Sequence, residues 1–181
     1  MKLQNKTQKI ILTSLMASIV LLSTLIKIVI PLPSGNTMIH LGNIACIVSG
    51  LLLGSIYGGL AAGIGSFLFD LLDPIFIASA PITFVLKFLM AFICGTVKKS
   101  LNIENPIIKN GISAIVGSIC FLVLYLIKTF IINAAVLKVS LAANLILIAK
   151  SGLISLINVI IAVVVSVPIV NTLEKRKDLF I

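Results

Sequence analysis

Four ionisable side chains interrupt segments that are otherwise apolar: Asp70, Lys87, Lys128 and Lys150. A charged group inside a lipid bilayer is costly unless it pairs, reaches the interface or faces water. Counting about 1.5 Å of rise per residue from the predicted helix ends places all four in the outer half of the hydrocarbon layer. Because they come from four segments and three are lysines, we predict a solvated, outward-open cavity for an anionic or carbonyl-rich ligand.

Neutral polar residues lie at the same predicted level and complete the predicted substrate site. They are Thr83, one helical turn before the lysine of its segment, and Asn133 and Asn144. Structural alternatives remain open for several of these positions. In these alternatives Asp70 forms an ion pair with a lysine, and Lys128 extends its ammonium to the lipid headgroups. The asparagines form hydrogen bonds between neighbouring helices.

The elements that position these residues are long apolar runs. The chain has 181 residues, is 60% hydrophobic and carries a formal net charge of +9, a composition typical of an integral membrane protein. We predict a single all-α membrane domain over residues 1–181. Its six expected transmembrane helices lie at about 10–30, 41–57, 59–73, 80–97, 107–133 and 142–171. They are separated by Pro31-Leu-Pro33-Ser-Gly35-Asn36, Gly58-Gly59, Asp73-Pro74 and Lys98-Lys99-Ser100.

Basic residues concentrate on one side of this arrangement, and cytoplasmic segments retain Lys and Arg. That side carries Lys2, Lys6, Lys9, Lys98, Lys99, Lys109, Lys175, Arg176 and Lys177. The loops on the other side, at 31–40, 74–79 and 134–141, contain only Lys138 among lysines and arginines. We therefore predict a multi-pass protein of the cell membrane with both termini cytoplasmic.

Small side chains recur every four residues in the second and third runs, as in Gly58, Ala62 and Ser66. This spacing favours close packing of helices in lipid. We expect Gly58-Gly59 to form a tight reversal between the two runs. The first run has similar steps at Thr13/Ala17 and Ser14/Ser18.

The motifs of several enzyme classes are missing. The sequence has neither GxxxxGK[ST] for ATP nor HExxH for zinc. Its single histidine, His40, is not accompanied by a nameable nucleophile and orienting group. The cysteines, Cys46, Cys94 and Cys120, lie singly in apolar runs, which favours packing over disulfides or metal. We expect no enzymatic activity, and neither metal nor cofactor bound by this chain.

A series of motifs occupies residues 33–95. They are Pro33-Ser-Gly35-Asn-Thr-Met-Ile-His40-Leu-Gly-Asn43, Gly58-Gly59-Leu-Ala-Ala-Gly-Ile-Gly-Ser66 with Asp70, Ala80-Pro-Ile-Thr83-Phe with Lys87, and Met90-Ala-Phe-Ile-Cys-Gly95. The series resembles the membrane S components of energy-coupling-factor (ECF) vitamin transporters, in particular the riboflavin and hydroxymethylpyrimidine subgroup. Residues 107–171 are similar mainly in helix count and in Ala143-Asn144-Leu145.

The resemblance implies a six-helix protein that captures a vitamin outside the cell. It also implies partners, namely a membrane coupling subunit and two cytoplasmic ATPases that use the ATP. The family usually carries an alanine pair on the first helix that docks the coupling subunit. The corresponding residues here are Thr13, Ser14, Ala17 and Ser18.

We therefore predict a substrate-binding S component for a water-soluble vitamin, either riboflavin or one like hydroxymethylpyrimidine or pyridoxine. Loops 31–40 and 74–79 are expected to act as lids over the outer cavity. Two alternatives remain: a stand-alone ion-coupled carrier or channel, and a non-transporting assembly factor.

Overall fold

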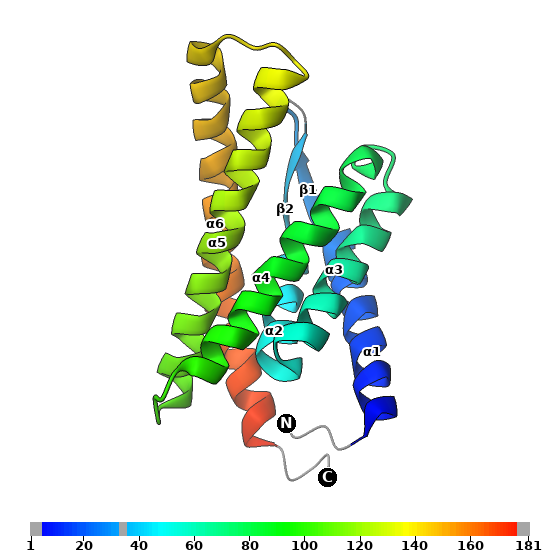
Figure 1. Cartoon of the computed structure of the whole chain (residues 1–181), viewed down its shortest axis with the longest axis vertical. Helices are drawn as coiled ribbons and strands as arrows, with labels where there is room; N and C mark the ends of the chain where they lie inside the picture. The colour runs from blue at the N-terminus through cyan, green and yellow to red at the C-terminus, as the bar shows by residue number, and fades with distance from the viewer. Residues whose placement is uncertain (1–4, 33–35, 177–181) are drawn as a thin grey trace.

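The computed structural model describes residues 5–32 and 36–176, which form six α-helices, a two-stranded hairpin and one short 3-10 helix (Figure 1). In order they are α1 (Lys6–Leu25), β1 (Lys27–Ile30), β2 (Thr37–His40), α2 (Gly42–Leu53), α3 (Ser55–Leu72), η1 (Ile77–Ser79), α4 (Ala80–Ser100), α5 (Pro106–Ala135) and α6 (Leu141–Lys175). The motif residues Pro33-Ser-Gly35 and the terminal residues Lys2 and Lys177 lie outside the described residues.

The predicted extension of the first helix to residue 30 is wrong. The helix ends at Leu25, and residues 27–30 form a strand that pairs antiparallel with residues 37–40, with Lys27 opposite His40 and Ile30 opposite Thr37. Two physical reasons explain the difference. The segment Ile28-Val-Ile is rich in β-branched residues that suit a strand, and Pro31 prevents a helix from continuing.

The reversal between α2 and α3 also differs from the prediction, because it lies at Gly54 rather than at Gly58-Gly59. Gly54 has a φ of 81°, a left-handed conformation that favours glycine, and its N–H donates to the Gly50 carbonyl at 3.1 Å. Gly58 and Gly59 lie inside α3, where they permit close packing. A Cβ at Gly59 would lie 2.9 Å from the Phe88 ring.

Five of the helices are long and apolar enough to cross a bilayer: α1, α3, α4 together with η1, α5 and α6. The exception is α2, whose 12 residues span only about 18 Å. The four residues of β2 precede α2 and add about 13 Å. Strand and helix together therefore match the roughly 30 Å thickness of a hydrocarbon layer.

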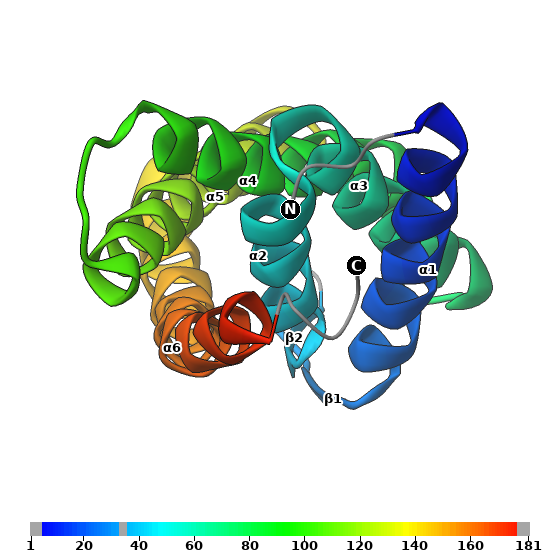
Figure 2. The same ribbon diagram turned by 90° about the horizontal axis from the view of Figure 1, so that it is seen from below.

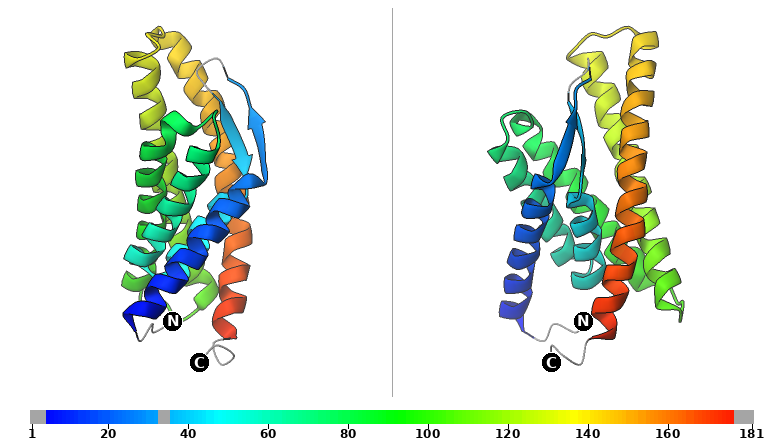
Figure 3. Two further views of the ribbon diagram at one scale, coloured as in Figure 1. Left: turned by 90° about the vertical axis from the view of Figure 1, so that its right-hand side faces the viewer. Right: turned by 180° about the vertical axis from the view of Figure 1, so that it is seen from behind.

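The helices surround α2, which contacts α1, α3, α4, α5 and α6 (Figure 2). One end of the bundle, where α1 begins and α6 ends, is termed the terminal end. The opposite end carries the β1–β2 hairpin and is termed the hairpin end. There α5 and α6 extend beyond α3 and α4 (Figure 1), and the hairpin stands beside α6 (Figure 3).

Glycines bring the helix backbones into close contact, as the small-residue spacing predicts. A Cβ on Gly65 of α3 would meet the Ala17 carbonyl oxygen of α1, and would lie 2.7 Å from the Val20 side chain. A Cβ on Gly117 of α5 would meet the Cys94 sulfur and lie 2.7 Å from the Met90 carbonyl oxygen of α4. These contacts fix α1, α3, α4 and α5 against one another at distances that larger residues do not allow.

The cysteines take part in this packing. Cys46 and Cys94 are fully buried in the apolar core, Cys120 is half-buried, and all three are free thiols. The core around them includes Ile47 and Met90, and no disulfide joins the described residues.

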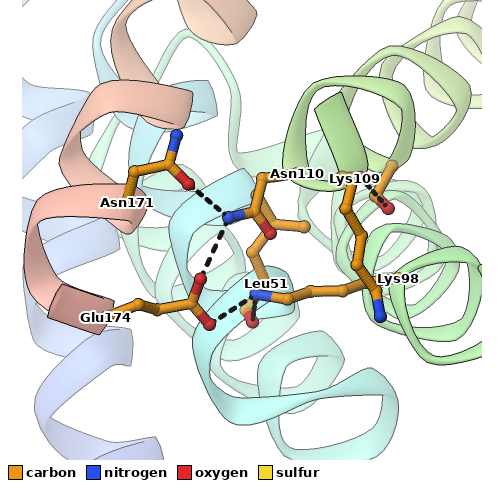
Figure 4. Close-up of polar contacts among 7 residues, drawn as sticks. Leu51, Lys98, Lys109, Asn110, Asn171 and Glu174 are labelled. Atoms are coloured by element: carbon orange, nitrogen blue, oxygen red, sulfur yellow. Dashed lines mark hydrogen bonds and ion pairs between the residues drawn. The ribbon is translucent and has the colours of Figure 1, made fainter. Parts of the chain in front are cut away.

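A polar cluster at the terminal end joins four elements (Figure 4). Glu174 of α6 accepts hydrogen bonds from Lys98 of α4 at 2.8 Å and from Asn110 of α5 at 3.0 Å. Lys98 also donates to the Leu51 carbonyl of α2 at 2.9 Å, and Asn110 donates to Asn171 at 2.7 Å. This terminal polar cluster (Lys98, Asn110, Asn171 and Glu174) fastens the ends of α2, α4, α5 and α6 together.

Candidate binding cavity

A partly open cavity of about 100 Å³ lies at the hairpin end, between β2 and helices α2 to α6. Its size leaves room for several water molecules. It is lined by Asn36, Thr37, Met38, His40, Asn43, Asp70, Phe76, Ser79, Thr83, Leu86, Lys87, Phe121, Tyr125, Lys128, Ser155 and Asn158. This mixture of aromatic walls with a few charged and amide side chains is typical of a small-molecule site.

Lys87 of α4 is the most buried cation of the cavity, with 5% of the residue exposed. Its ammonium donates a hydrogen bond to the side-chain oxygen of Asn43 and lies 4.0 Å from the centre of the Phe121 ring. An amide oxygen and the face of an aromatic ring both favour a positive charge. An ammonium has three N–H groups, so Lys87 keeps donors for a ligand.

Asp70 of α3 is the single carboxylate among the lining residues and is 2% exposed. The Thr83 side chain of α4 interacts with it. The two ion pairs within the described parts of the chain are Lys27–Asp73 and Lys98–Glu174, so no lysine lies within 4.0 Å of the Asp70 carboxylate. Among the described residues, Asp70 therefore forms no direct ion pair with a lysine, unlike the structural alternative considered for it.

Lys128 of α5 is half-buried and lines the cavity. Its ammonium is 5.9 Å from the centre of the Tyr125 ring, which also lines the cavity. Asp70, Thr83, Lys87 and Lys128 thus share one hollow, from three different helices.

The β1–β2 hairpin forms one side of the cavity and is anchored at three places. Asn158 of α6 accepts a hydrogen bond from the His40 backbone N–H at 3.1 Å and donates to the Met38 carbonyl at 2.7 Å. Its side-chain amide therefore pairs with the free edge of β2 as a third strand would. Non-helical backbone at membrane depth requires such internal partners.

The other two anchors hold the hairpin to α5 and to the α3–α4 connection. The Thr37 hydroxyl lies 3.3 Å from the Tyr125 hydroxyl, within hydrogen-bonding distance. Lys27 forms an ion pair with Asp73 and lies 4.5 Å from the centre of the Phe69 ring. The expected lid loops 31–40 and 74–79 thus contribute Asn36, Thr37 and Phe76 to the cavity wall.

His40 presents a neutral imidazole to the cavity. Its Nδ1 accepts a hydrogen bond from the Gly42 backbone N–H at 3.1 Å, so the proton of the neutral ring resides on Nε2. The histidine therefore adds a hydrogen-bond donor to the wall and no charge.

Three of the predicted substrate-site residues lie elsewhere. Asn133 and Asn144 are buried near the tip of the α5–α6 pair, where the Asn133 amide donates to Asn144 Oδ1 at 2.9 Å and the Asn144 amide donates to the Phe130 carbonyl at 3.3 Å. Lys150 is exposed on α6. None of the three lines the cavity. The prediction that these residues share the hollow with Asp70 differs from this structure, because the two asparagines bond each other near the tip of the α5–α6 pair and Lys150 is exposed.

The small residues of α1 divide between two faces. Thr13 and Ala17 are buried, with the Ala17 backbone against Gly65 of α3. Ser14 and Ser18 are exposed on the outer face of the helix. Only the second pair is accessible to another protein in this structure.

Asn43, His40, Ser155 and Asn158 belong to the cavity but not to the predicted site. A signal for two of them exists in the sequence, because Ser155 and Asn158 belong to a polar stripe on one face of the last helix. His40 ends the second strand of the unpredicted hairpin and Asn43 lies three residues beyond it, so their place in the cavity depends on where that hairpin folds.

The described residues contain no group of three or more His, Cys, Asp or Glu side chains that could hold a metal ion. The chemistry that this cavity offers is instead two ammonium groups, one carboxylate, neutral donors and aromatic faces. Such a wall can hold a polar ring compound without reacting with it.

Comparison with known protein families gives one match. A family model described as "ECF-type riboflavin transporter, S component" matches residues 4–175, nearly the whole chain. A search of curated proteins gives no significant match.

Proposed function

The chain belongs to the family of ECF-type riboflavin transporter S components, and from this premise we propose that it captures a water-soluble vitamin in the hairpin-end cavity. Members of this family are membrane-integral transport subunits, which agrees with the five helices long enough to cross a bilayer. The proposal makes the chain a binding protein and not an enzyme.

The observation that carries the proposal is the convergence of charged side chains on one cavity. Asp70 of α3 and Lys87 of α4 are buried, Lys128 of α5 is half-buried, and all three line the same hollow. Ionisable groups at membrane depth that surround a cavity mark a substrate site or pathway. The aromatic residues Phe121 and Tyr125 supply flat surfaces for a vitamin ring.

We propose that the chain crosses the membrane six times, with β2 and α2 together forming the second crossing. Basic side chains support a cytoplasmic location for the terminal end: Lys6, Lys9, Lys98, Lys99, Lys109, Lys175 and Arg176 all lie there. The hairpin end then faces outside, where the cavity meets its substrate.

Energy for uptake comes from partners in this proposal. The chain lacks an ATP-binding motif, and its family implies a transmembrane coupling subunit with ATPase modules. We propose that the coupling subunit docks on the Ser14/Ser18 face of α1, since the Thr13/Ala17 face is already packed on α3. ATP is used by the ATPases, and this chain binds no cofactor.

Binding to the purified chain tests the proposal. Riboflavin, pyridoxine, hydroxymethylpyrimidine, pantothenate and folate are titrated into the detergent-solubilised protein without ATP. The proposal expects saturable binding of at least one of them at about one molecule per chain. Absence of binding across the panel, or ion-driven uptake by vesicles that contain this chain alone, would contradict it and favour a stand-alone carrier.

A further inference from the structure

The charges that line the cavity do not balance. Lys87 and Lys128 contribute two formal positive charges and Asp70 one negative charge, while the His40 ring accepts a hydrogen bond at Nδ1 and is neutral. No other Asp, Glu, Lys or Arg lines the cavity within the part of the chain that the structure describes. The wall therefore carries a formal net charge of +1, from two lysines and one aspartate.

Neighbouring ions do not cancel the excess. Lys27 and Asp73, next to the cavity, neutralise each other as an ion pair. Lys138 and Lys150 are exposed and do not line the cavity. Of the described acidic residues, Glu104 and Glu174 lie toward the terminal end, in the α4–α5 connection and the terminal polar cluster.

The unpaired arrangement matters because two of the charged side chains are buried. Asp70 is 2% exposed and Lys87 is 5% exposed, yet no ion pair within 4.0 Å joins Asp70 to either cavity lysine. Charges that face the same cavity without touching leave hydrogen-bonding positions open on both sides of it. A low-dielectric wall strengthens the attraction of the surplus cation for an anion.

Resting on the proposed function, we propose that the vitamin captured here carries one negative charge, as a carboxylate or a phosphate group. The anionic group binds between Lys87 and Lys128, and a hydroxyl, amide or ring N–H of the same molecule donates to Asp70. Binding then brings the cavity and its contents close to zero net charge. A neutral ring compound leaves the surplus ammonium without a partner.

Matched pairs of compounds that differ in this one charge provide the test. The probes are nicotinate with nicotinamide, pantothenate with panthenol, and riboflavin 5′-phosphate with riboflavin. Each is titrated into the purified full-length chain by calorimetry at pH 7.5. In at least one pair we expect the charged member to bind roughly tenfold or more tightly than the neutral one, because hydrogen bonds to charged groups are the stronger kind.

Variants distinguish binding of the anion in the cavity from its general attraction to a basic protein. Lys128→Gln is expected to reduce the preference for the charged member at least about fivefold, while Lys128→Arg keeps it. The matched control Lys150→Gln removes an exposed lysine and is expected to leave the preference unchanged. Raising the salt concentration should also preserve most of it, since screening acts mainly on exposed charges.

Each outcome has a distinct meaning. Tighter binding of the charged member that Lys128→Gln removes supports the inference. Equal or tighter binding of the neutral member overturns the inference but leaves the proposed vitamin capture intact. A preference that Lys150→Gln reduces as much as Lys128→Gln does also overturns it, because the anion is then not held in the cavity. No binding of any compound here or in the vitamin panel overturns both proposals.

Discussion

The side chain of Asn158 on α6 accepts a hydrogen bond from the backbone N–H of His40 on β2 at 3.1 Å. The same amide donates to the Met38 carbonyl at 2.7 Å, so one side chain satisfies the open edge of the strand. This relationship links the last helix to the hairpin beside the cavity. It explains why an amide is tolerated in the interior of a membrane helix, since its partners are main-chain groups that lipid cannot satisfy.

Replacing Asn158 with Ala should loosen the hairpin. The change leaves one buried N–H and one carbonyl without a partner, at a cost of about 1–3 kcal/mol each where water does not replace the amide. We expect faster hydrogen exchange at residues 37–40, measured by mass spectrometry. Asn144→Ala is the matched control, because that amide bonds Asn133 and the Phe130 carbonyl. Equal acceleration by both variants, or by neither, would contradict the anchoring role.

Replacing Gly65 with Ala should destabilise the bundle. The added methyl group would meet the Ala17 carbonyl oxygen and the Val20 side chain, so α1 and α3 must separate. Overpacking of this kind costs about 1–3 kcal/mol, measurable as a lower unfolding temperature in detergent. Gly111→Ala is the control, since a Cβ there meets nothing within 4 Å. If the two variants unfold at the same temperature, the close approach of α1 and α3 is not important to stability.

The terminal polar cluster should contribute to stability but not to ligand binding. Glu174→Ala removes one of the two acceptors described for Lys98 and for Asn110, of which the first is partly and the second fully buried. We expect a loss of about 1–2 kcal/mol in unfolding free energy. Glu104→Ala is the control because Glu104 is exposed in the α4–α5 connection. Vitamin affinity should be the same in both variants, and a selective loss in Glu174→Ala would show coupling between the two ends.

The helices could be predicted from the sequence because each is a long apolar run. The hairpin could not, since Lys27-Ile-Val-Ile continues the apolar pattern of α1 without a break. Its strand character depends on pairing with residues 37–40, a contact that hydrophobicity does not encode. Gly54 and Gly58-Gly59 similarly differ only in context: one adopts a left-handed turn and the others face neighbouring helices.

The same limit applies to the site. Asp70, Thr83, Lys87 and Lys128 could be placed together because charges at one membrane depth require a shared polar environment. Depth alone did not separate them from Asn133, Asn144 and Lys150. That separation depends on how the helices pack, since Asn133 and Asn144 bond each other between α5 and α6 while Lys150 is exposed. The sequence shows that Asn158 is a polar residue in an apolar helix, but it does not predict the strand β2 to which Asn158 bonds.

The small molecules that accompany the purified protein test the cavity most directly. Cells that express the chain are grown with the five vitamins named above, and compounds released by denaturing the purified protein are quantified by mass spectrometry. Wild-type protein and Lys150→Met should release one of the vitamins at close to one per chain, whereas folded Lys87→Met and Asp70→Asn should release at least about tenfold less. Equal release from all four proteins, or none from the wild type, would contradict vitamin capture in this cavity.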